Sequence, residues 1–133
     1  MDQLRDIMIK KVITITREKT AQDAAILMAE HATGSVIVVN GESIVGIVTE
    51  RDLVRKVCTK DVPSSKIPLS DVMSSPVISA EPDMPIETAV QRMFNNKIRR
   101  LPILENGKLV GIVTVSDLAK HFRTKSLIEK TFE

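Results

Sequence analysis

The feature that most constrains this chain is an internal repeat with one fixed offset. The run Val-Gly-Ile-Val-Thr that begins at Val45 begins again at Val110, and the same shift of 65 positions carries Asp52 onto Asp117. A constant offset along the whole chain indicates two copies of one supersecondary unit. Further identical pairs at this offset are Leu4/Leu69, Asp6/Asp71, Met8/Met73, Val12-Ile13/Val77-Ile78, Ala24/Ala89 and Met28/Met93.

The length of the chain indicates how the two copies are stabilised. With 133 residues, the chain has the size of one compact domain, which buries roughly two-thirds of its unfolded surface. Each copy alone would be marginally stable at about half of that length. We therefore expect the two copies to share a core.

The composition argues against several classes of protein. A net charge of +2 with dispersed Lys and Arg lacks the basic patch of a nucleic-acid binder, and the absence of Trp and Tyr removes most stacking platforms. Cys58 is the single cysteine, which excludes an internal disulfide and favours a reducing compartment. No apolar run has membrane-spanning length, and the N-terminus lacks a signal-peptide pattern. We expect a soluble cytoplasmic protein.

Apolar periodicity predicts the same order of elements in both copies: a short amphipathic lead-in, a strand, a helix, two strands joined at Asn-Gly, and a helix. Helix starts are expected at Thr20, with Asp23 three residues on, and at Pro85 after Asp83. The expected elements of the first copy are Leu4–Met8, Val12–Ile15, the helix with Ala21 to Met28, Val36–Val39, Ile44–Val48 and Glu50–Val57. Those of the second are Leu69–Met73, Val77–Ser79, the helix with Ile86 to Phe94, Leu101–Leu104, Leu109–Val113 and Val115–His121.

These elements predict an α/β (α+β) chain in which each repeat has a small three-stranded sheet with helices. The repeats are expected at residues 1–62 and 69–122, joined by a linker at 63–68 that is rich in Pro and Ser. Residues 123–133 form a tail in which Leu127, Ile128 and Phe132 could extend the last helix and pack on the body or on a partner.

The candidate chemistry lies in the repeated Gly-x-x-Thr-x-x-Asp motif, Gly46 to Asp52 and Gly111 to Asp117. The motif stands where a strand meets a helix, and a helix start offers free N–H groups and a positive dipole end to an anion. The Thr49 or Thr114 hydroxyl can donate to phosphate, and an ionised Asp accepts both hydroxyls of a ribose. Together these groups suit a nucleotide. Thr and Asp at this spacing also form a helix capping box, but the repetition of the whole motif favours function.

With these motifs the chain resembles a tandem pair of CBS (cystathionine-β-synthase-type) domains, a Bateman module, over residues 3 to 122. Asp-x-Met near each start and Leu101-Pro102-Ile103 add to the likeness. The resemblance implies face-to-face sheets with two clefts between the repeats for AMP, ADP, ATP or S-adenosylmethionine. It places ribose ligands at Asp52 and Asp117, phosphate ligands at Thr49, Thr114, Arg99 and Arg100, and the adenine against Val12, Ile13, Val77 and Ile78.

The first copy departs from this pattern because Gly34-Ser35 stand where the second copy has Arg99-Arg100. Only one repeat then supplies cations at this point, so we expect unequal phosphate sites, with Asp117 rather than Asp52 beside the arginines. Solvated charge at the start of an exposed strand is the alternative interpretation of the two arginines.

The sequence therefore predicts a non-catalytic, regulatory homodimer that binds an adenine nucleotide and contacts a regulated protein. No nucleophile–base pair stands at a motif spacing, and we expect no enzyme, no resident cofactor and no metal. His31 and His121 are interpreted as residues of helix surfaces. A scaffold without ligand is the second hypothesis. Nucleic-acid binding through Arg99, Arg100, Lys120, Arg123 and Lys125 is a weaker third.

Overall fold

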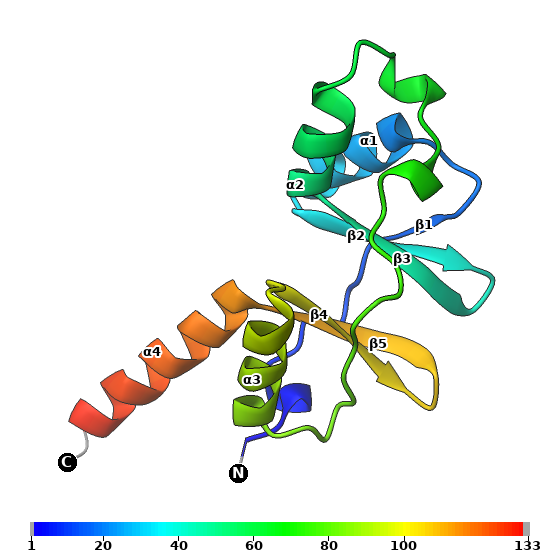
Figure 1. Ribbon diagram of the computed structural model, residues 1–133. Coiled ribbons are helices and arrows are strands. Elements are labelled where there is room, and N and C mark those ends of the chain that lie inside the picture. Colours follow the sequence, from blue (N-terminus) through cyan, green and yellow to red (C-terminus); the bar gives the residue numbers. More distant parts are fainter. Residues whose placement is uncertain (1, 132–133) are drawn as a thin grey trace. The chain divides into compact units, whose positions relative to one another are not determined.

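The computed structural model describes residues 2–131 and divides them into two compact units. We call Val12–Val77 the continuous unit, and residues 2–11 together with 78–131 the split unit. In Figure 1 the blue N-terminal segment lies beside α3 and the yellow strands, far from it in sequence. Each unit therefore contains the strands of one repeat and the lead-in of the other, so the units cross the repeat boundaries expected from the sequence.

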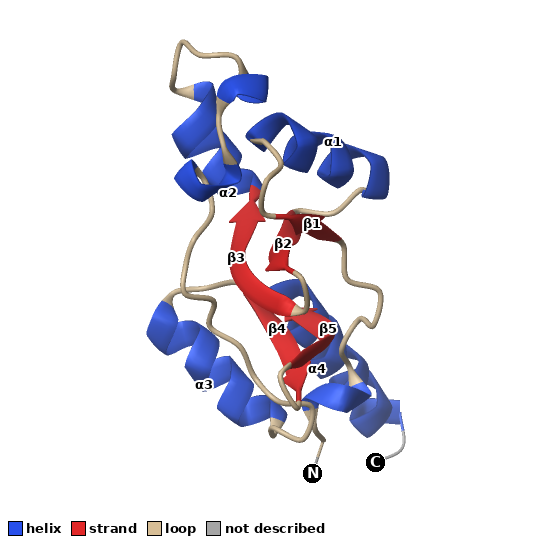
Figure 2. Ribbon diagram, turned by 90° about the vertical axis from the view of Figure 1, so that its right-hand side faces the viewer, coloured by secondary structure: helices blue, strands red, loops and turns tan. Residues whose placement is uncertain are grey.

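The continuous unit contains a three-stranded sheet with helices. Its sheet has the order β1-β2-β3, with β1 parallel and β3 antiparallel to β2. Helix α1 packs against β2, and α2 packs against β3 and α1 (Figure 2). The elements are β1 (Thr14–Thr16), α1 (Ala21–His31), β2 (Ser35–Asn40), β3 (Ser43–Thr49), α2 (Glu50–Leu53), a π-helical turn (Val54–Cys58) and 3-10 turns at Ser64–Lys66 and Leu69–Asp71.

The split unit contains a two-stranded antiparallel sheet, β4-β5, with α3 packed against β4 and α4 against β5. The lead-in Leu4–Met8 contributes a 3-10 turn, and Ile9 pairs with Ile112 of β5. The elements are the 3-10 turn Leu4–Asp6, α3 (Ile86–Asn96), β4 (Arg100–Glu105), β5 (Lys108–Thr114) and α4 (Val115–Thr131).

The expectation of three strands per repeat is wrong for the second copy. Ala80 makes a single parallel bridge to Ile103, and no strand forms over Val77–Ser79. In the first copy the Ile37 amide donates to the Ile13 carbonyl at 3.0 Å. The residue equivalent to Ile37 is Pro102, which has no N–H to donate. The edge strand of the second copy loses that hydrogen bond. Strand β1 also starts later than expected, at Thr14 instead of Val12.

Both predicted hairpins form, but their turns differ. In the second hairpin Asn106 and Gly107 both have positive φ, as a two-residue turn of type I′ requires, and they connect the paired residues Glu105 and Lys108. In the first hairpin Asn40 belongs to β2 and pairs with Ser43, so the loop is Gly41–Glu42.

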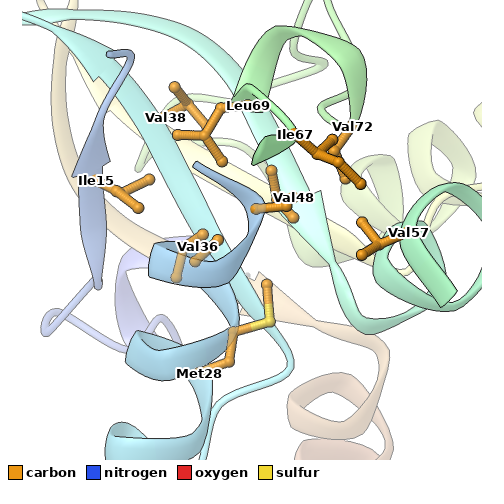
Figure 3. Packing of buried hydrophobic residues seen from close by; sticks show 11 residues of the cluster. Ile15, Met28, Val36, Val38, Val48, Val57, Ile67, Leu69 and Val72 are labelled. Atoms are coloured by element: carbon orange, nitrogen blue, oxygen red, sulfur yellow. The ribbon is translucent and has the colours of Figure 1, made fainter. Parts of the chain in front are cut away.

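Each unit has its own hydrophobic core, and each core contains residues of both copies, so the copies share two cores. In the continuous unit Ile67, Leu69 and Val72 point into the cluster around Val48 (Figure 3). All three come from chain segments expected to be a linker or the start of the second repeat. In the split unit Leu4 is fully buried among residues of α3, β4 and β5. The exchange of lead-ins therefore completes both cores.

The motif glycines are required by this exchange. A Cβ atom on Gly46 would lie 2.5 Å from Sδ of Met73, and one on Gly111 would lie 2.8 Å from Sδ of Met8. Each methionine of a lead-in thus covers the glycine of the other repeat, and a Cβ at either glycine would force the methionine to shift. The interpretation of these methionines as packing residues is confirmed, because both pack against the cores.

The predicted linker is more ordered than expected, and the tail extends the last helix, as the sequence allowed. Within the predicted linker, Ile67 is 4% exposed and Pro68 pairs with Thr20. The tail continues α4 to Thr131, with Leu127 exposed on it, whereas Phe132 lies outside the described residues. No helix within residues 2–131 combines the length and apolarity needed to cross a bilayer.

Candidate functional site

The repeated motif places its threonine and aspartate at the junction of a strand and a helix in each unit. Thr49 precedes α2, and its N–H and hydroxyl donate to Oδ2 of Asp52 at 2.9 and 3.0 Å. Thr114 makes the same contacts to Oδ2 of Asp117, also at 2.9 and 3.0 Å. The aspartate amides donate back to the hydroxyls at 3.3 and 3.2 Å. Both motifs therefore form the capping box that was the alternative interpretation.

A third capping box lies outside the motif. Thr20 and Asp23, at the start of α1, repeat these contacts at 2.9, 3.0 and 3.3 Å. The backbone and hydroxyl hydrogen bonds from Thr20 lower the pKa of Asp23 below its ordinary value. Because the same geometry occurs where no nucleotide motif exists, the Thr–Asp contacts alone do not distinguish a cap from a ligand site.

The helix starts offer fewer free donors than the sequence predicted. The Glu50 and Val115 amides donate to the carbonyls of Gly34 and Arg99 at 3.1 and 2.9 Å. The single hydroxyl proton of each motif threonine is directed to its own aspartate, so it is not free for a phosphate. An anion at these positions would depend mainly on side-chain cations.

Such cations lie beside the second motif. Arg100 is the β-sheet partner of Thr114, and the Arg99 carbonyl accepts from the first amide of α4. Arg99 is exposed and Arg100 half-buried. At the equivalent places of the continuous unit, Ser35 pairs with Thr49 and Gly34 accepts from Glu50. The structure thus places the backbones of both arginines at the end of the β4-β5 sheet where Thr114 leads into α4.

Three of the four apolar candidates, Val12, Ile13 and Ile78, precede the edge segments of the two sheets. In the continuous unit, half-buried Val12 and Ile13 lead into β1. Ile78 is 36% exposed and is the first residue of the second segment of the split unit, two residues before the bridge at Ala80. Val77 is the last residue of the continuous unit. Arg92 of α3 donates to the Ser79 carbonyl at 2.6 Å and so anchors the backbone next to Ile78.

Sequence reasoning missed Lys56. Its Nζ lies 3.5 Å from Oδ1 of Asp52 and donates to the Val72 carbonyl at 3.0 Å. The i, i+4 spacing of Asp52 and Lys56 is a readable signal for such a pair on a helix. His121 stands at the equivalent place in the second copy, but its Nε2 lies 3.4 Å from Oδ2 of Asp2. Within residues 2–131, no hydrogen bond or ion pair engages Oδ1 of Asp117.

The histidines differ from each other. His31 is exposed at the end of α1, as expected, whereas the side chain of His121 is only 19% exposed and packs edge-on against Phe122. The part of the chain that the structure describes contains no group of three or more His, Cys, Asp or Glu residues arranged to hold a metal ion. Cys58 is free and exposed.

Comparisons with known proteins agree on one family. The family model described as the CBS domain matches residues 4–59 and 69–124. Protein MK0525 of Methanopyrus kandleri is 46% identical over 111 residues, which cover 82% of this chain and 57% of that protein. The CBS domain-containing protein YhcV of Bacillus subtilis is 39% identical over 119 residues, which cover 90% of this chain and 84% of that protein.

A solved structure extends the similarity to a liganded protein. The CBS domain pair of protein MJ0100, in complex with 5′-methylthioadenosine and S-adenosylmethionine, aligns with a TM-score of 0.84 at 25% identity. The alignment covers 94% of this chain and 98% of that chain.

Proposed function

The chain belongs to the CBS-domain family, and we propose that it is a non-catalytic sensing module whose Gly-x-x-Thr-x-x-Asp motifs bind an adenine nucleotide or adenosine derivative. The observation that carries the proposal is the gathering of Arg99, Arg100, Thr114 and Asp117 at one end of the β4-β5 sheet. Arginines can bind phosphate and a carboxylate can bind ribose, so this set holds groups for both halves of a nucleotide. AMP, ADP, ATP and S-adenosylmethionine remain the candidate ligands.

The free carboxylate oxygens distinguish the two motifs. Oδ2 of each aspartate is occupied by its threonine, so a ribose hydroxyl would donate to Oδ1. Oδ1 of Asp52 lies 3.5 Å from the Lys56 ammonium group and keeps capacity to accept a second donor, and Asp52 is 9% exposed. Asp117 is half-buried, and no ion pair among residues 2–131 involves it. Because Arg99 and Arg100 stand beside Thr114, whereas Gly34 and Ser35 take their places beside Thr49, we expect the tighter nucleotide site at Asp117.

A ligand-free scaffold is the competing function, and one observation favours it. All three Thr–Asp pairs have the same capping geometry, including Thr20–Asp23 outside the motif. If capping were the only role of these pairs, the motif would be repeated for two structural reasons alone. Its Thr and Asp would stabilise a helix start, and its Gly would make room for the methionine of the other lead-in.

Calorimetry with adenosine and 2′,3′-dideoxyadenosine separates the two functions. Asp117→Ala should weaken adenosine binding but leave the weaker binding of the dideoxy analogue nearly unchanged, since the analogue offers no diol to the carboxylate. Asp23→Ala is the matched control, because it removes the same capping contacts without touching the motif. No heat of binding for any adenosine compound at millimolar concentration would refute the sensing function.

The arginines are tested by the preference for AMP over adenosine. We expect the double change Arg99→Ala, Arg100→Ala to abolish this preference at the tight site, because charge-assisted contacts to phosphate are lost. A preference equal to that of the unaltered chain would show that both arginines are solvated surface.

The proposal also includes the homodimer. Several large apolar side chains on helices are exposed, most of all Phe94 of α3 at 78%, followed by Val54 beside α2 and Leu127 of α4 at 59% each. Burial of such residues against a second copy would stabilise a dimer. Sedimentation equilibrium measures this directly, and a monomer at all concentrations would remove dimerisation from the proposal.

A further inference from the structure

Lys56 connects two parts of the continuous unit that the sequence does not relate. It lies in the π-helical turn Val54–Cys58, one turn beyond the motif aspartate. Its ammonium group donates to the Val72 carbonyl at 3.0 Å and lies 3.5 Å from Oδ1 of Asp52. The lysine side chain is 39% exposed and that of Asp52 only 12%. One cation thus joins a shielded carboxylate of the first repeat to the lead-in of the second.

The second repeat lacks this connection. Its equivalent residue, His121, lies next to Asp2 and makes no described contact with Asp117 or with Ile7, the counterpart of Val72. The split unit nevertheless has the same capping box and the same packed lead-in. The Lys56 contacts are therefore not needed to build the shared fold of a repeat, and they call for another explanation.

The chain that follows Val72 indicates what the Lys56 contacts do. Met73 covers Gly46, and Ser74 exchanges two backbone hydrogen bonds with Ile47 at 2.9 and 3.2 Å. The chain then runs within four residues to Val77 and Ile78, which are candidate adenine contacts. The ammonium group of Lys56 therefore fastens the start of a segment, Val72 to Ile78, whose end belongs to the proposed ligand site of the second repeat.

We propose that Lys56 is a positioning residue. Its ammonium group orients Asp52 for a ribose hydroxyl, and a ligand bound at Asp52 strengthens the hydrogen bond from Lys56 to the Val72 carbonyl, which holds the lead-in. The inference rests on the proposed function for the part in which a ligand binds at Asp52. An ammonium group has three donors, so it can bond Val72 and Asp52 together. A ligand that holds Oδ1 in place then also stabilises the contact with Val72, and the effect is reciprocal.

The fastening is tested without ligand by amide hydrogen exchange. Val72, Met73 and Ser74 donate to Leu69 or Ile47 in the continuous unit, and Ile7, Met8 and Ile9 make the equivalent bonds in the split unit. Lys56→Met keeps the apolar stem and removes the donor. We expect it to speed exchange at Val72–Ser74 by about two- to tenfold, the range for losing one hydrogen bond. Exchange at residues 7–9 should not change, and Lys56→Arg should restore slow exchange.

The coupling is tested in an Asp117→Ala background, which leaves Asp52 as the motif carboxylate. Lys56→Met should weaken adenosine binding by about fivefold, the upper value for a partly exposed ion pair. Binding of 2′,3′-dideoxyadenosine should change much less, and Lys56→Arg should recover most of the loss. Adenosine should slow exchange at Val72–Ser74 in the Lys56 chain but not in the Lys56→Met chain.

The possible results separate the two ideas. Unchanged exchange at Val72–Ser74 in Lys56→Met, or an equal rise in both lead-ins, would overturn the fastening role. Adenosine binding that does not depend on Lys56 would overturn the coupling. If the unaltered chain binds no adenosine compound, the proposed function fails and the coupling fails with it, while the exchange measurement still decides the fastening.

Discussion

Replacement of Gly46 by alanine offers the most direct test of the exchanged lead-ins. The added Cβ would lie 2.5, 2.9 and 3.0 Å from Sδ, Cγ and Cβ of Met73, whereas carbon atoms in good contact are about 3.5–4.0 Å apart. Met73 would have to move by about 1 Å, and overpacking of this kind costs about 1–3 kcal/mol. Alanine recovers about 0.5–1 kcal/mol of backbone entropy. We therefore expect a net loss of about 1–2 kcal/mol.

A double-mutant cycle with Met73→Ala identifies the cause of that loss. The second change removes Sδ and Cγ, so the clash largely disappears in the double variant. The two destabilisations, measured by urea unfolding, should then sum to more than the effect of the double variant by about 1 kcal/mol. Additivity to within about 0.5 kcal/mol would refute the packing of Met73 over Gly46.

The equivalent cycle in the split unit serves as the control. There the third-nearest atom to a Cβ on Gly111 is the Ile9 carbonyl oxygen, at 3.1 Å. Ile9 is fixed by hydrogen bonds to Ile112 in both directions. Met8→Ala should therefore rescue Gly111→Ala less completely than Met73→Ala rescues Gly46→Ala. The crossed pair, Gly46→Ala with Met8→Ala, should be additive.

Two further predictions follow from buried and capping residues. Ile67→Ala should destabilise the chain by about 2–4 kcal/mol in urea unfolding, although Ile67 lies in the segment expected to be a linker, because its side chain is 4% exposed. The lowered pKa of Asp23 means that its contribution to stability is complete above the ordinary pKa of about 3.8 and is lost as the pH falls through the lower folded value. The stability difference between the unaltered chain and Asp23→Asn should therefore shrink between pH 5 and pH 2, and a constant difference would contradict the assignment.

Local patterns in the sequence predicted much of the fold. The apolar stripes predicted both repeat helices, and the Asn-Gly steps predicted both hairpins, since helix period and turn chemistry depend on neighbouring residues. The missing edge strand at Val77–Ser79 could also have been read, because Pro102 removes the amide that Ile37 supplies in the first copy. The expectation of symmetry between the copies concealed that signal.

The exchange of lead-ins could not be predicted in the same way. Leu4 and Leu69 are identical at the repeat offset, so either leucine fits either core equally well by pattern. Only the three-dimensional path of the chain decides which sheet each one covers. The candidate site shows the same limit: the neighbourhood of Arg100 and Thr114 follows from strand register, whereas the contact between Lys56 and Val72 joins residues 16 positions apart through a turn that no local pattern predicts.

The division into a continuous and a split unit has a consequence for synthesis on the ribosome. All residues of Val12–Val77 are available once position 77 has emerged, so this unit can close its core while the rest of the chain is still being made. The split unit cannot close its core at that stage, because its strands have not yet been made. Its first segment, which contains Leu4, is made before the continuous unit, and its last strand is made long after it. These two segments lie at the ends of a long stretch of chain and must then be brought together. During that interval Leu4 and Met8 have no core to join, so these apolar side chains stay exposed on the nascent chain until β5 has been made.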